Sequence, residues 1–323
     1  MAYPVHLISW GSGQNALYSY LTIPFIALLG NTTMAMRLPM AIVGSVSLYL
    51  IYFILDRLYG HRFSLLSLIL IGIMPWHIMK SRWGLESNLF PDLILWGSLL
   101  ILYSCHTKHW IPFYLSGIIM GISSYSYGTS YFFLFFYILI LLGYLLIQKK
   151  IKWYSAIGYL AVVGVLCIPI ILFLYINLFD KETIHLLWFD IPKLKVDRFH
   201  SVTSIFSADF LMNIKENLLE GLRLILLQDD SLPWNGISVF GCLYLFTLPF
   251  SVIGLFHRNS RKEKLLAGLD ENHKDFSDFV NLFRIWLLVS IMLMLILSNN
   301  INRLNVIWFS LGQSQEFKTW ESI

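Results

Sequence analysis

Two cations stand in a short polar turn between two very apolar segments. The turn lies within PWHIMKSRWGLESNLFP, residues 75–91, and its cations are Lys80 and Arg82. Arginine offers a planar fork of N–H donors to phosphate oxygens, and lysine offers a compact positive charge. The pair could therefore bind a phosphate group. Alternatively, both side chains simply extend to the polar surface of a membrane.

Two further arginines are predicted to lie at the same membrane boundary as Lys80 and Arg82. Arg37 opens an apolar run in the tripeptide Arg37-Leu38-Pro39, and Arg303 precedes another run in NNINRLN. Because a charge at a membrane edge needs partners or water, cations from separate segments favour one shared anion-binding pocket. Chance placement of the four cations is the alternative.

A third polar stretch, QDDSLPWN at residues 228–235, combines carboxylates, an amide and an indole. Together these groups suit the hydroxyls and the apolar faces of a sugar. A polar cap for the helix that follows is the alternative interpretation.

The sequence carries no metal or nucleotide signature. Its nine histidines show no HExxH or Cys/His spacing, and no Walker-type or GxGxxG loop follows a strand. We therefore assign no metal site and no cofactor, and leave the need for a divalent cation open. The net charge of +4 gives no indication of nucleic-acid binding. Cys105, Cys167 and Cys242 lie in or beside apolar runs, which favours packing over disulfides.

The candidate phosphate- and sugar-binding residues lie between long apolar runs, which must position them. The 323-residue chain is 57% hydrophobic and 13% charged, with a mean hydropathy of +0.67, whereas ordinary soluble domains are roughly 25% charged. Runs of about 20 apolar residues are long enough to cross roughly 30 Å of hydrocarbon. We predict an all-α fold, a polytopic membrane helical bundle of about eight complete spans. The predicted spans are 39–56, 63–79, 89–105, 111–127, 129–147, 153–177, 236–256 and 280–298.

The placement of lysine and arginine predicts the orientation. One set of alternate loops, which we predict to be cytoplasmic, holds Arg57 and Arg62, then Lys108, then the lysines of residues 149–152, then the cations of residues 258–274. The opposite, outer set comprises residues 1–38, the turns at 80–88 and 125–130, the long loop 178–235 and the turn 299–303. Within the first of these, an interfacial helix over residues 14–30 is favoured over a full span.

Both ends of the chain are unusual for this topology. The first residues would lie outside with no preceding span or signal peptide, and the apolar run opening at Leu304 stops at Leu311 before a polar tail at 312–323. We expect a truncation or a changed reading frame at both ends. Residues 1–311 are predicted to form one transmembrane domain, with six spans in 39–177, two in 236–298 and an incomplete one in 299–311.

Several motifs taken together resemble one known family. They are WGSGQNALYSYL, Arg37-Leu38-Pro39, Pro75-Trp76-His77, Ser81-Arg82-Trp83-Gly84-Leu85-Glu86-Ser87-Asn88, QDDSLPWN and Asn302-Arg303-Leu304-Asn305. In this order, and to about residue 311, the chain resembles GT-C type glycosyltransferases of the family 39 kind, the bacterial relatives of protein O-mannosyltransferases and aminoarabinose transferases.

The resemblance implies transfer of a sugar from an undecaprenyl- or dolichyl-phosphate carrier to an acceptor on the outer face of a bacterial plasma membrane. It implies that Arg82 and Arg303, supported by Arg37 and Lys80, hold the lipid phosphate.

The resemblance also implies a catalytic base that the given sequence does not contain. In the family this base is a carboxylate in an Asp-Glu pair, which follows a first transmembrane helix. Both the helix and the pair precede the segment that matches Tyr3-Pro4-Val5, so both are expected upstream of Met1. We therefore assign no catalytic residue within the 323 residues, and we expect the chain to be inactive alone.

The remaining candidates would contact the sugar or the acceptor. They are Glu86, Asn88, Asp229, Asp230 and Asn235, with Trp10, Gln14 and Trp234 shaping the cavity. The expected partners are the polyprenyl-phosphate-linked sugar donor and membrane lipids. Two other functions stay open: a transporter or flippase for lipid-linked sugars, which needs cations but no base, and a noncatalytic membrane protein.

Overall fold

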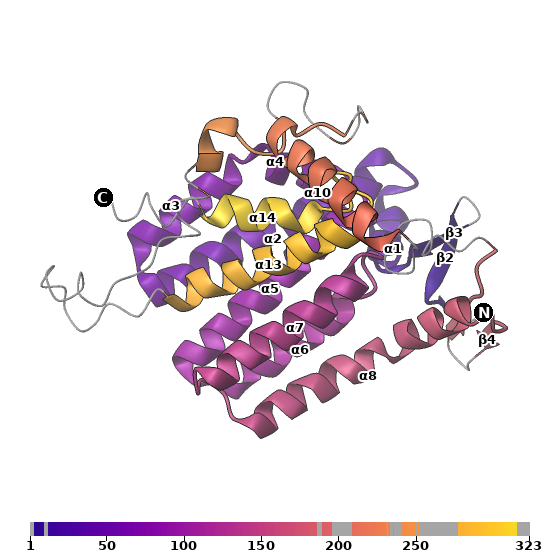
Figure 1. Ribbon diagram of the computed structural model, residues 1–323, viewed down its shortest axis with the longest axis horizontal. Helices are drawn as coiled ribbons and strands as arrows, with labels where there is room; N and C mark the ends of the chain where they lie inside the picture. The colour runs from indigo at the N-terminus through magenta and orange to yellow at the C-terminus, as the bar shows by residue number, and fades with distance from the viewer. Residues whose placement is uncertain are drawn as a thin grey trace, which may run out of the picture.

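The structure is a computed structural model, and it describes most of the chain. The described residues are 3–9, 12–185, 189–195, 209–230, 232, 235, 241–249, 251 and 277–314. Most of them belong to helices that run side by side in one bundle (Figure 1). The predicted all-α membrane fold is therefore confirmed.

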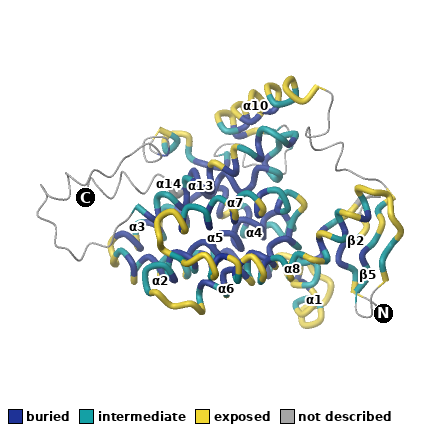
Figure 2. Tube along the Cα trace, turned by 60° about the horizontal axis from the view of Figure 1, so that its bottom comes forward, coloured by how far each residue is buried: buried dark blue, intermediate teal, exposed yellow. Residues whose placement is uncertain are grey.

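Five helices of the described part are long and apolar enough to cross a membrane. They are α2 (Thr33–Tyr59), α5 (Glu86–Thr107), α7 (Ser130–Ile147), α8 (Trp153–Leu178) and α13 (Ser277–Ile296). Helix α5 is the most buried of the five and α8 the least. The bundle is therefore built around α5, while α8 covers one side and presents most of its surface outward (Figure 2).

The predicted second span, 63–79, is wrong as one continuous helix. The chain forms α3 (His61–Gly72) and α4 (Pro75–Arg82), which meet at a bend of 65°. Pro75 is the first residue of α4, and Met74 before it is extended, with a ψ of 124°. A residue that precedes proline is displaced from the α region, so the break follows from the local sequence. Counted together, the pair gives a sixth span.

The predicted span 111–127 is also shorter than expected. Helix α6 (Trp110–Ser123) has 14 residues, and its end is rich in serine. The hydroxyls of Ser123 and Ser124 donate back to the carbonyls of Met120 and Gly121, at 2.7 Å each. Such local bonds compete with continuation of a helix.

The predicted span 236–256 lies mostly outside the described residues, so the described part holds five or six of the eight expected spans. A short 3₁₀ turn, η1 (Leu245–Thr247), falls within this region.

The apolar run that begins at Leu304 forms a short helix, α14 (Asn305–Ser314), and the incomplete span expected over 299–311 stays a prediction. It packs beside α13 (Figure 1), and the indole N–H of Trp286 donates to the Val306 carbonyl at 2.9 Å. Trp308 and Phe309 are completely buried. All residues from 305 to 312 are buried within the bundle. Of the predicted polar tail, residues 315–323 lie outside the described part.

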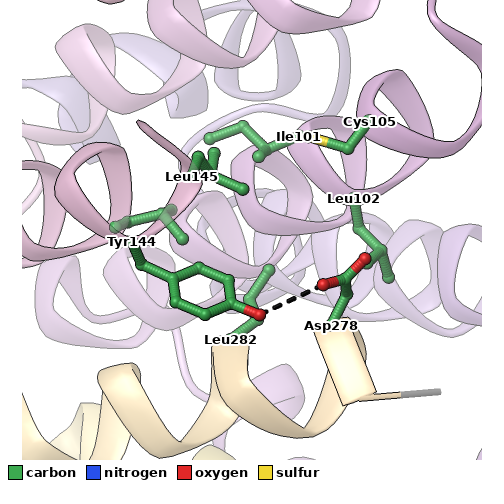
Figure 3. A pocket seen from close by; sticks show the side chains of 8 residues that line it. Ile101, Leu102, Cys105, Tyr144, Leu145, Asp278 and Leu282 are labelled. Atoms are coloured by element: carbon green, nitrogen blue, oxygen red, sulfur yellow. Dashed lines mark hydrogen bonds between the residues drawn. The ribbon is translucent and has the colours of Figure 1, made fainter. Parts of the chain in front are cut away.

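One end of the bundle gathers the described loops that were predicted to be cytoplasmic, whereas residues 258–274 lie outside the described part. Buried Asp278, at the start of α13, pairs with Lys150 and accepts a hydrogen bond from Tyr144 at 3.1 Å. His106, at the end of α5, lies 3.6 Å from the same carboxylate. A small, mostly apolar pocket lies beside this cluster (Figure 3). It is lined by Ile101, Leu102, Cys105, Leu141, Tyr144, Leu145, Asp278 and Leu282.

The other end carries small elements that the sequence did not predict. Strands β2 (His6–Ser9) and β3 (Ser12–Asn15) form a hairpin, and β1 (Tyr3–Pro4), β5 (Phe189–Ile191) and β4 (Ile184–His185) form a sheet in the order β1-β5-β4. In that sheet β1 runs parallel to β5, with Tyr3 opposite Phe189. The N-terminal segment and the long loop therefore share one sheet.

Two further helices belong to the same end. Helix α1 (Leu17–Leu29) has 13 residues, about 20 Å of helix, which is too short to cross roughly 30 Å of hydrocarbon. A helix was expected over residues 14–30, and its placement at the membrane interface stays a prediction. Helix α10 (Phe210–Leu227) lies within the long loop and is largely exposed (Figure 2).

Candidate functional site

The three arginines singled out in the sequence lie at the end of the bundle that carries the small sheets. Arg37 is in the second turn of α2, and Arg82 is the last residue of α4; both are exposed. Arg303 lies in the turn before α14 and is partly buried. None of the three has a carboxylate partner within 4.0 Å among the described residues.

The segments of Arg37 and Arg82 touch through a glycine. A Cβ atom added at Gly84 would lie 2.5 Å from the carbonyl oxygen of Met36 and 2.7 Å from the hydroxyl of Tyr18. Tyr18 itself donates to that Met36 carbonyl at 2.7 Å. Only glycine allows the backbone after Arg82 to approach the backbone before Arg37 this closely.

The segments of Arg82 and Arg303 are joined by a buried asparagine. The Asn305 amide donates to the Ser87 carbonyl at 3.0 Å and to the Asn88 side-chain oxygen at 2.9 Å. Its own oxygen accepts from the indole N–H of Trp76. Because Asn305 follows Arg303 by two residues, this cluster holds the Arg303 turn against the start of α5.

The turn that carries Arg303 is also hydrogen-bonded to the stretch 228–235. The carboxylate of Asp230 accepts hydrogen bonds from the Ile301 N–H at 3.0 Å and from the Asn235 amide at 2.6 Å. The Asn235 oxygen in turn accepts from the Asn302 amide at 2.7 Å. QDDSLPWN and NNINRLN, which are about 70 residues apart in the chain, therefore form one polar network.

Arg303 is already partly oriented within this network. Its guanidinium donates to the Ser298 carbonyl at 3.0 Å and also bonds the Ser298 hydroxyl. A guanidinium has five N–H donors, so these two contacts leave donors for a further acceptor.

Lys80 differs from the arginines because it faces the core. Its side chain is completely buried and forms an ion pair with completely buried Asp92. Its ammonium also lies 5.0 Å from the ring centre of Trp76 and 5.6 Å from that of Phe309. The other Asp92 oxygen accepts from Ser47 at 2.6 Å. The structure thus separates Lys80 from the exposed arginines and gives its charge an internal partner.

The polar residues at the start of α5 differ in availability. Asn88 is fully engaged, since its amide donates to the Trp83 carbonyl at 3.0 Å while its oxygen accepts from Asn305. Glu86 lies beside the Asn15 backbone. One of its carboxylate oxygens is buried and has no hydrogen-bond partner among the described residues. Glu86 therefore has an acceptor left for a ligand, whereas Asn88 uses both ends of its amide.

The remaining candidates are placed as follows. Asp229 is exposed at the end of α10, and Gln14 is half-buried in β3, paired with Leu7. Trp10 and Trp234 lie outside the described residues. The pocket of Figure 3 lies at the opposite end of the bundle and contains none of the candidates.

The expected catalytic carboxylate cannot be located in the described part of the chain. The Asp-Glu pair was predicted upstream of Met1, and Met1 itself lies outside the described residues, which begin at Tyr3. We therefore assign no catalytic base to a described residue. The expectation that the chain is inactive alone stays a prediction.

A buried polar network next to Glu86 was missed in the sequence. The His6 ring stacks on Phe173 with 3.5 Å between ring centres, and its Nε2 lies 2.7 Å from the Tyr131 hydroxyl. Tyr131 donates to the Asn15 side-chain oxygen at 3.0 Å. Burial lowers the pKa of His6 to about 4. No spacing rule links these residues, since they come from the hairpin, α7 and α8.

Fold and site together define a multi-pass membrane protein with a group of arginines at one end. Residues 15–176, half of the chain, match the dolichyl-phosphate-mannose-protein mannosyltransferase family, and the chain belongs to that family. The family consists of membrane glycosyltransferases that use a polyprenyl-phosphate-linked sugar. No curated protein and no solved structure matches the chain.

The matched region includes Arg37, Lys80, Arg82, Glu86 and Asn88. Arg303 and the stretch 228–235 lie beyond it, so their connection to the site depends on the contacts described above.

Proposed function

We propose that the protein binds the phosphate of a polyprenyl-phosphate sugar between Arg82 and Arg303, with Arg37 in support, and takes part in transfer of that sugar to an acceptor. The observation that carries the proposal is the joining of three arginine segments by the contacts at Gly84 and Asn305. The absence of carboxylate partners for these arginines among the described residues leaves their charge for an anionic ligand.

The chemistry of transfer explains why arginines are needed. As an acceptor hydroxyl attacks the anomeric carbon, the bond from that carbon to the phosphate oxygen breaks and negative charge develops on the phosphate. Guanidinium groups that are already in position stabilise this charge. The hydroxyl proton passes to a base, for which a carboxylate is suited.

Lys80 supports the site indirectly in this proposal. Its pairing with Asp92 anchors α4, and Arg82 is the last residue of α4. We propose that Lys80 orients the arginine and does not itself contact the phosphate.

The sugar and acceptor contacts are assigned to the polar residues around the arginines. Glu86 has a carboxylate oxygen without a partner among the described residues, which suits a hydroxyl of either substrate. Asp229 is exposed beside the network of Asp230 and Asn235. We propose that Asn88, Asp230 and Asn235 shape the site through the bonds they already make, together with Trp10, Gln14 and Trp234.

We further propose that the arginine end faces outward, in a bacterial plasma membrane. The short loops at the Asp278 end hold more lysine and arginine (Arg57, Arg62, Lys108, Lys149, Lys150 and Lys152) than the short segments at the other end (Arg37, Lys80, Arg82 and Arg303), which supports this orientation.

Binding of undecaprenyl phosphate to the full chain in lipid nanodiscs tests the proposal. Each of Arg82→Ala and Arg303→Ala is expected to weaken binding by roughly tenfold or more, because hydrogen bonds to charged groups contribute about 1.5–3 kcal/mol. Arg62→Ala is the matched control, since Arg62 is an exposed arginine in the first turn of α3, away from the site. Unchanged affinity in both site variants would remove these arginines from the phosphate role.

A further inference from the structure

Helix α10 presents a row of exposed apolar side chains. At 100° per residue, one side of the helix holds Asn217, Gly221 and Leu224, which are buried. A second sector holds Leu211, Leu218, Leu219, Leu222 and Leu226, which are all exposed, between 38% and 80% of their surface. A third sector holds Glu216, Glu220 and Arg223, with Leu227 at the end of the helix, and all four are exposed.

The buried side of α10 lies across the last turn of the spanning helix α13. The Asn217 amide donates to the Leu295 carbonyl at 3.0 Å, and the Asn299 amide donates to the Asn217 carbonyl at 2.6 Å. Gly221 lies against the side chain of Met294. Since α13 ends at Ile296, α10 lies at the level where a spanning helix leaves the hydrocarbon.

We propose that the exposed leucines of α10 enter the boundary between headgroups and acyl chains of the bilayer leaflet on the arginine side. A cluster of exposed apolar side chains marks an interaction surface, and an apolar sector beside a charged sector is typical of a helix that lies in the plane of a membrane. Helix α13, on which α10 packs, also exposes Leu288 and Ile291, so the leucine sector adds to an apolar surface of a spanning helix.

The position of Lys215 indicates that the leucine sector contacts lipid rather than an apolar protein surface. By helical spacing it lies within the leucine sector, between Leu222 and Leu226 in angle, and it is exposed. A lysine in this position places its methylenes along the apolar surface and its ammonium among anionic headgroups. Facing a purely apolar protein surface, the same charge would be unpaired.

The contact has a consequence for the site. Helix α10 leads directly into Gln228 and Asp230, and Asp230 bonds the turn that carries Arg303. Lipid contact through α10 therefore holds the Arg303 turn at a fixed height relative to the membrane surface. The inference itself does not depend on which ligand the arginines bind.

Spin labels test the position of each sector in the full chain. Cysteines are introduced singly at Leu219, Leu222, Glu216 and Glu220 after replacement of Cys105, Cys167 and Cys242 by alanine. The labelled proteins are measured in vesicles of phosphatidylethanolamine and phosphatidylglycerol. At positions 219 and 222, collisions with oxygen are expected to exceed those with a water-soluble nickel complex, and the order should reverse at positions 216 and 220. Equal, water-like accessibility at all four positions would overturn the inference.

A second measurement uses the unaltered chain, in case the cysteine replacements disturb folding. Vesicles containing a phosphatidylcholine with a photoactivated group on its acyl chain are irradiated, and adducts are mapped by mass spectrometry. Adducts are expected on peptides covering 211–226, and also on α8, whose exposed Ile168 and Ile171 serve as the positive control. Adducts on α8 without any on α10 would show that a protein partner or solvent covers the leucines.

Discussion

Lys80 and Asp92 form an ion pair in which both side chains are completely buried. The pair joins α4 to α5, and Asp92 extends the connection to α2 through Ser47, whose hydroxyl also accepts from the Trp96 indole at 2.7 Å. Burying a charge inside a membrane bundle costs free energy, so charged side chains there are almost always paired. This one fixes the short helix that ends at Arg82.

Asp92→Asn should destabilise the protein strongly. It leaves the Lys80 ammonium buried without a counter-charge, a change that costs about 3–5 kcal/mol in buried pairs. Thermal unfolding of the detergent-purified variant is the measurement. The double change Lys80→Met with Asp92→Leu removes both charges and should recover much of the loss. A variant Asp92→Asn as stable as the parent would show that the pair has no structural role.

Gly84→Ala should disturb the contact between the Arg37 and Arg82 segments. The added methyl group would lie 2.5 Å from the Met36 carbonyl oxygen, and overpacking of this kind costs about 1–3 kcal/mol. We expect a lower unfolding temperature together with weaker binding of undecaprenyl phosphate. Gly164→Ala in α8 is the matched control, because an added Cβ there meets nothing within 4 Å. Equal behaviour of the two variants would argue against a specific contact at Gly84.

Asn305→Leu should loosen the Arg303 turn. The change removes hydrogen bonds to Ser87, Asn88 and Trp76 and leaves buried polar groups unpaired, at about 1–3 kcal/mol for each group. Ser290→Ala in the neighbouring helix α13 is the control, because this buried hydroxyl donates to the Trp286 carbonyl of its own helix. Loss of phosphate-ligand affinity in the first variant but not in the second is the expected result. If both variants bind like the parent, the asparagine is not needed for the site.

Acid should weaken the N-terminal hairpin through His6. The pKa of His6 is lowered from 6.5 to about 4 in the folded protein by burial, so between these values the unfolded chain binds a proton that the folded chain does not. The contribution of His6 to stability is therefore constant above about pH 6.5 and is lost as the pH decreases toward 4, by roughly 3 kcal/mol at 1.36 kcal/mol per pKa unit.

Unfolding temperatures of the parent and of His6→Gln at pH 7 and pH 5 measure this effect. The parent should lose more stability than the variant on acidification. His185→Gln, which changes an exposed histidine, should behave like the parent. An identical loss in the parent and in His6→Gln would assign the acid sensitivity to other groups.

The spanning helices were predictable because length and apolarity alone determine them. The predicted spans 129–147 and 153–177 correspond closely to α7 (Ser130–Ile147) and α8 (Trp153–Leu178). The break before Pro75 was missed because a hydropathy average runs across it, although the proline itself favours an extended residue at Met74. The small sheets were missed because strands of two to four residues are too short to show a clear periodic pattern.

The sequence predicted that the candidate arginines lie at one end of the bundle, but it did not predict their contacts. Alternating loops place Arg37, Arg82 and Arg303 on one face, and the structure joins their segments on that face. Lys80 shows what the sequence could not reveal. It is two residues from Arg82, yet it points inward, and its partner Asp92 is identifiable only once α4 and α5 are packed. The connection from Asp230 to Ile301 likewise depends on tertiary structure.

The most direct measurement compares two ligands that differ only in the phosphate. Affinities of undecaprenyl phosphate and undecaprenol are determined for the parent, Arg82→Ala, Arg303→Ala and the double variant in nanodiscs. If both arginines bind the phosphate, each single change weakens the affinity for undecaprenyl phosphate by roughly tenfold or more and leaves the affinity for undecaprenol unchanged. Equal losses for the two ligands, or no loss for either, would contradict a shared phosphate site at Arg82 and Arg303.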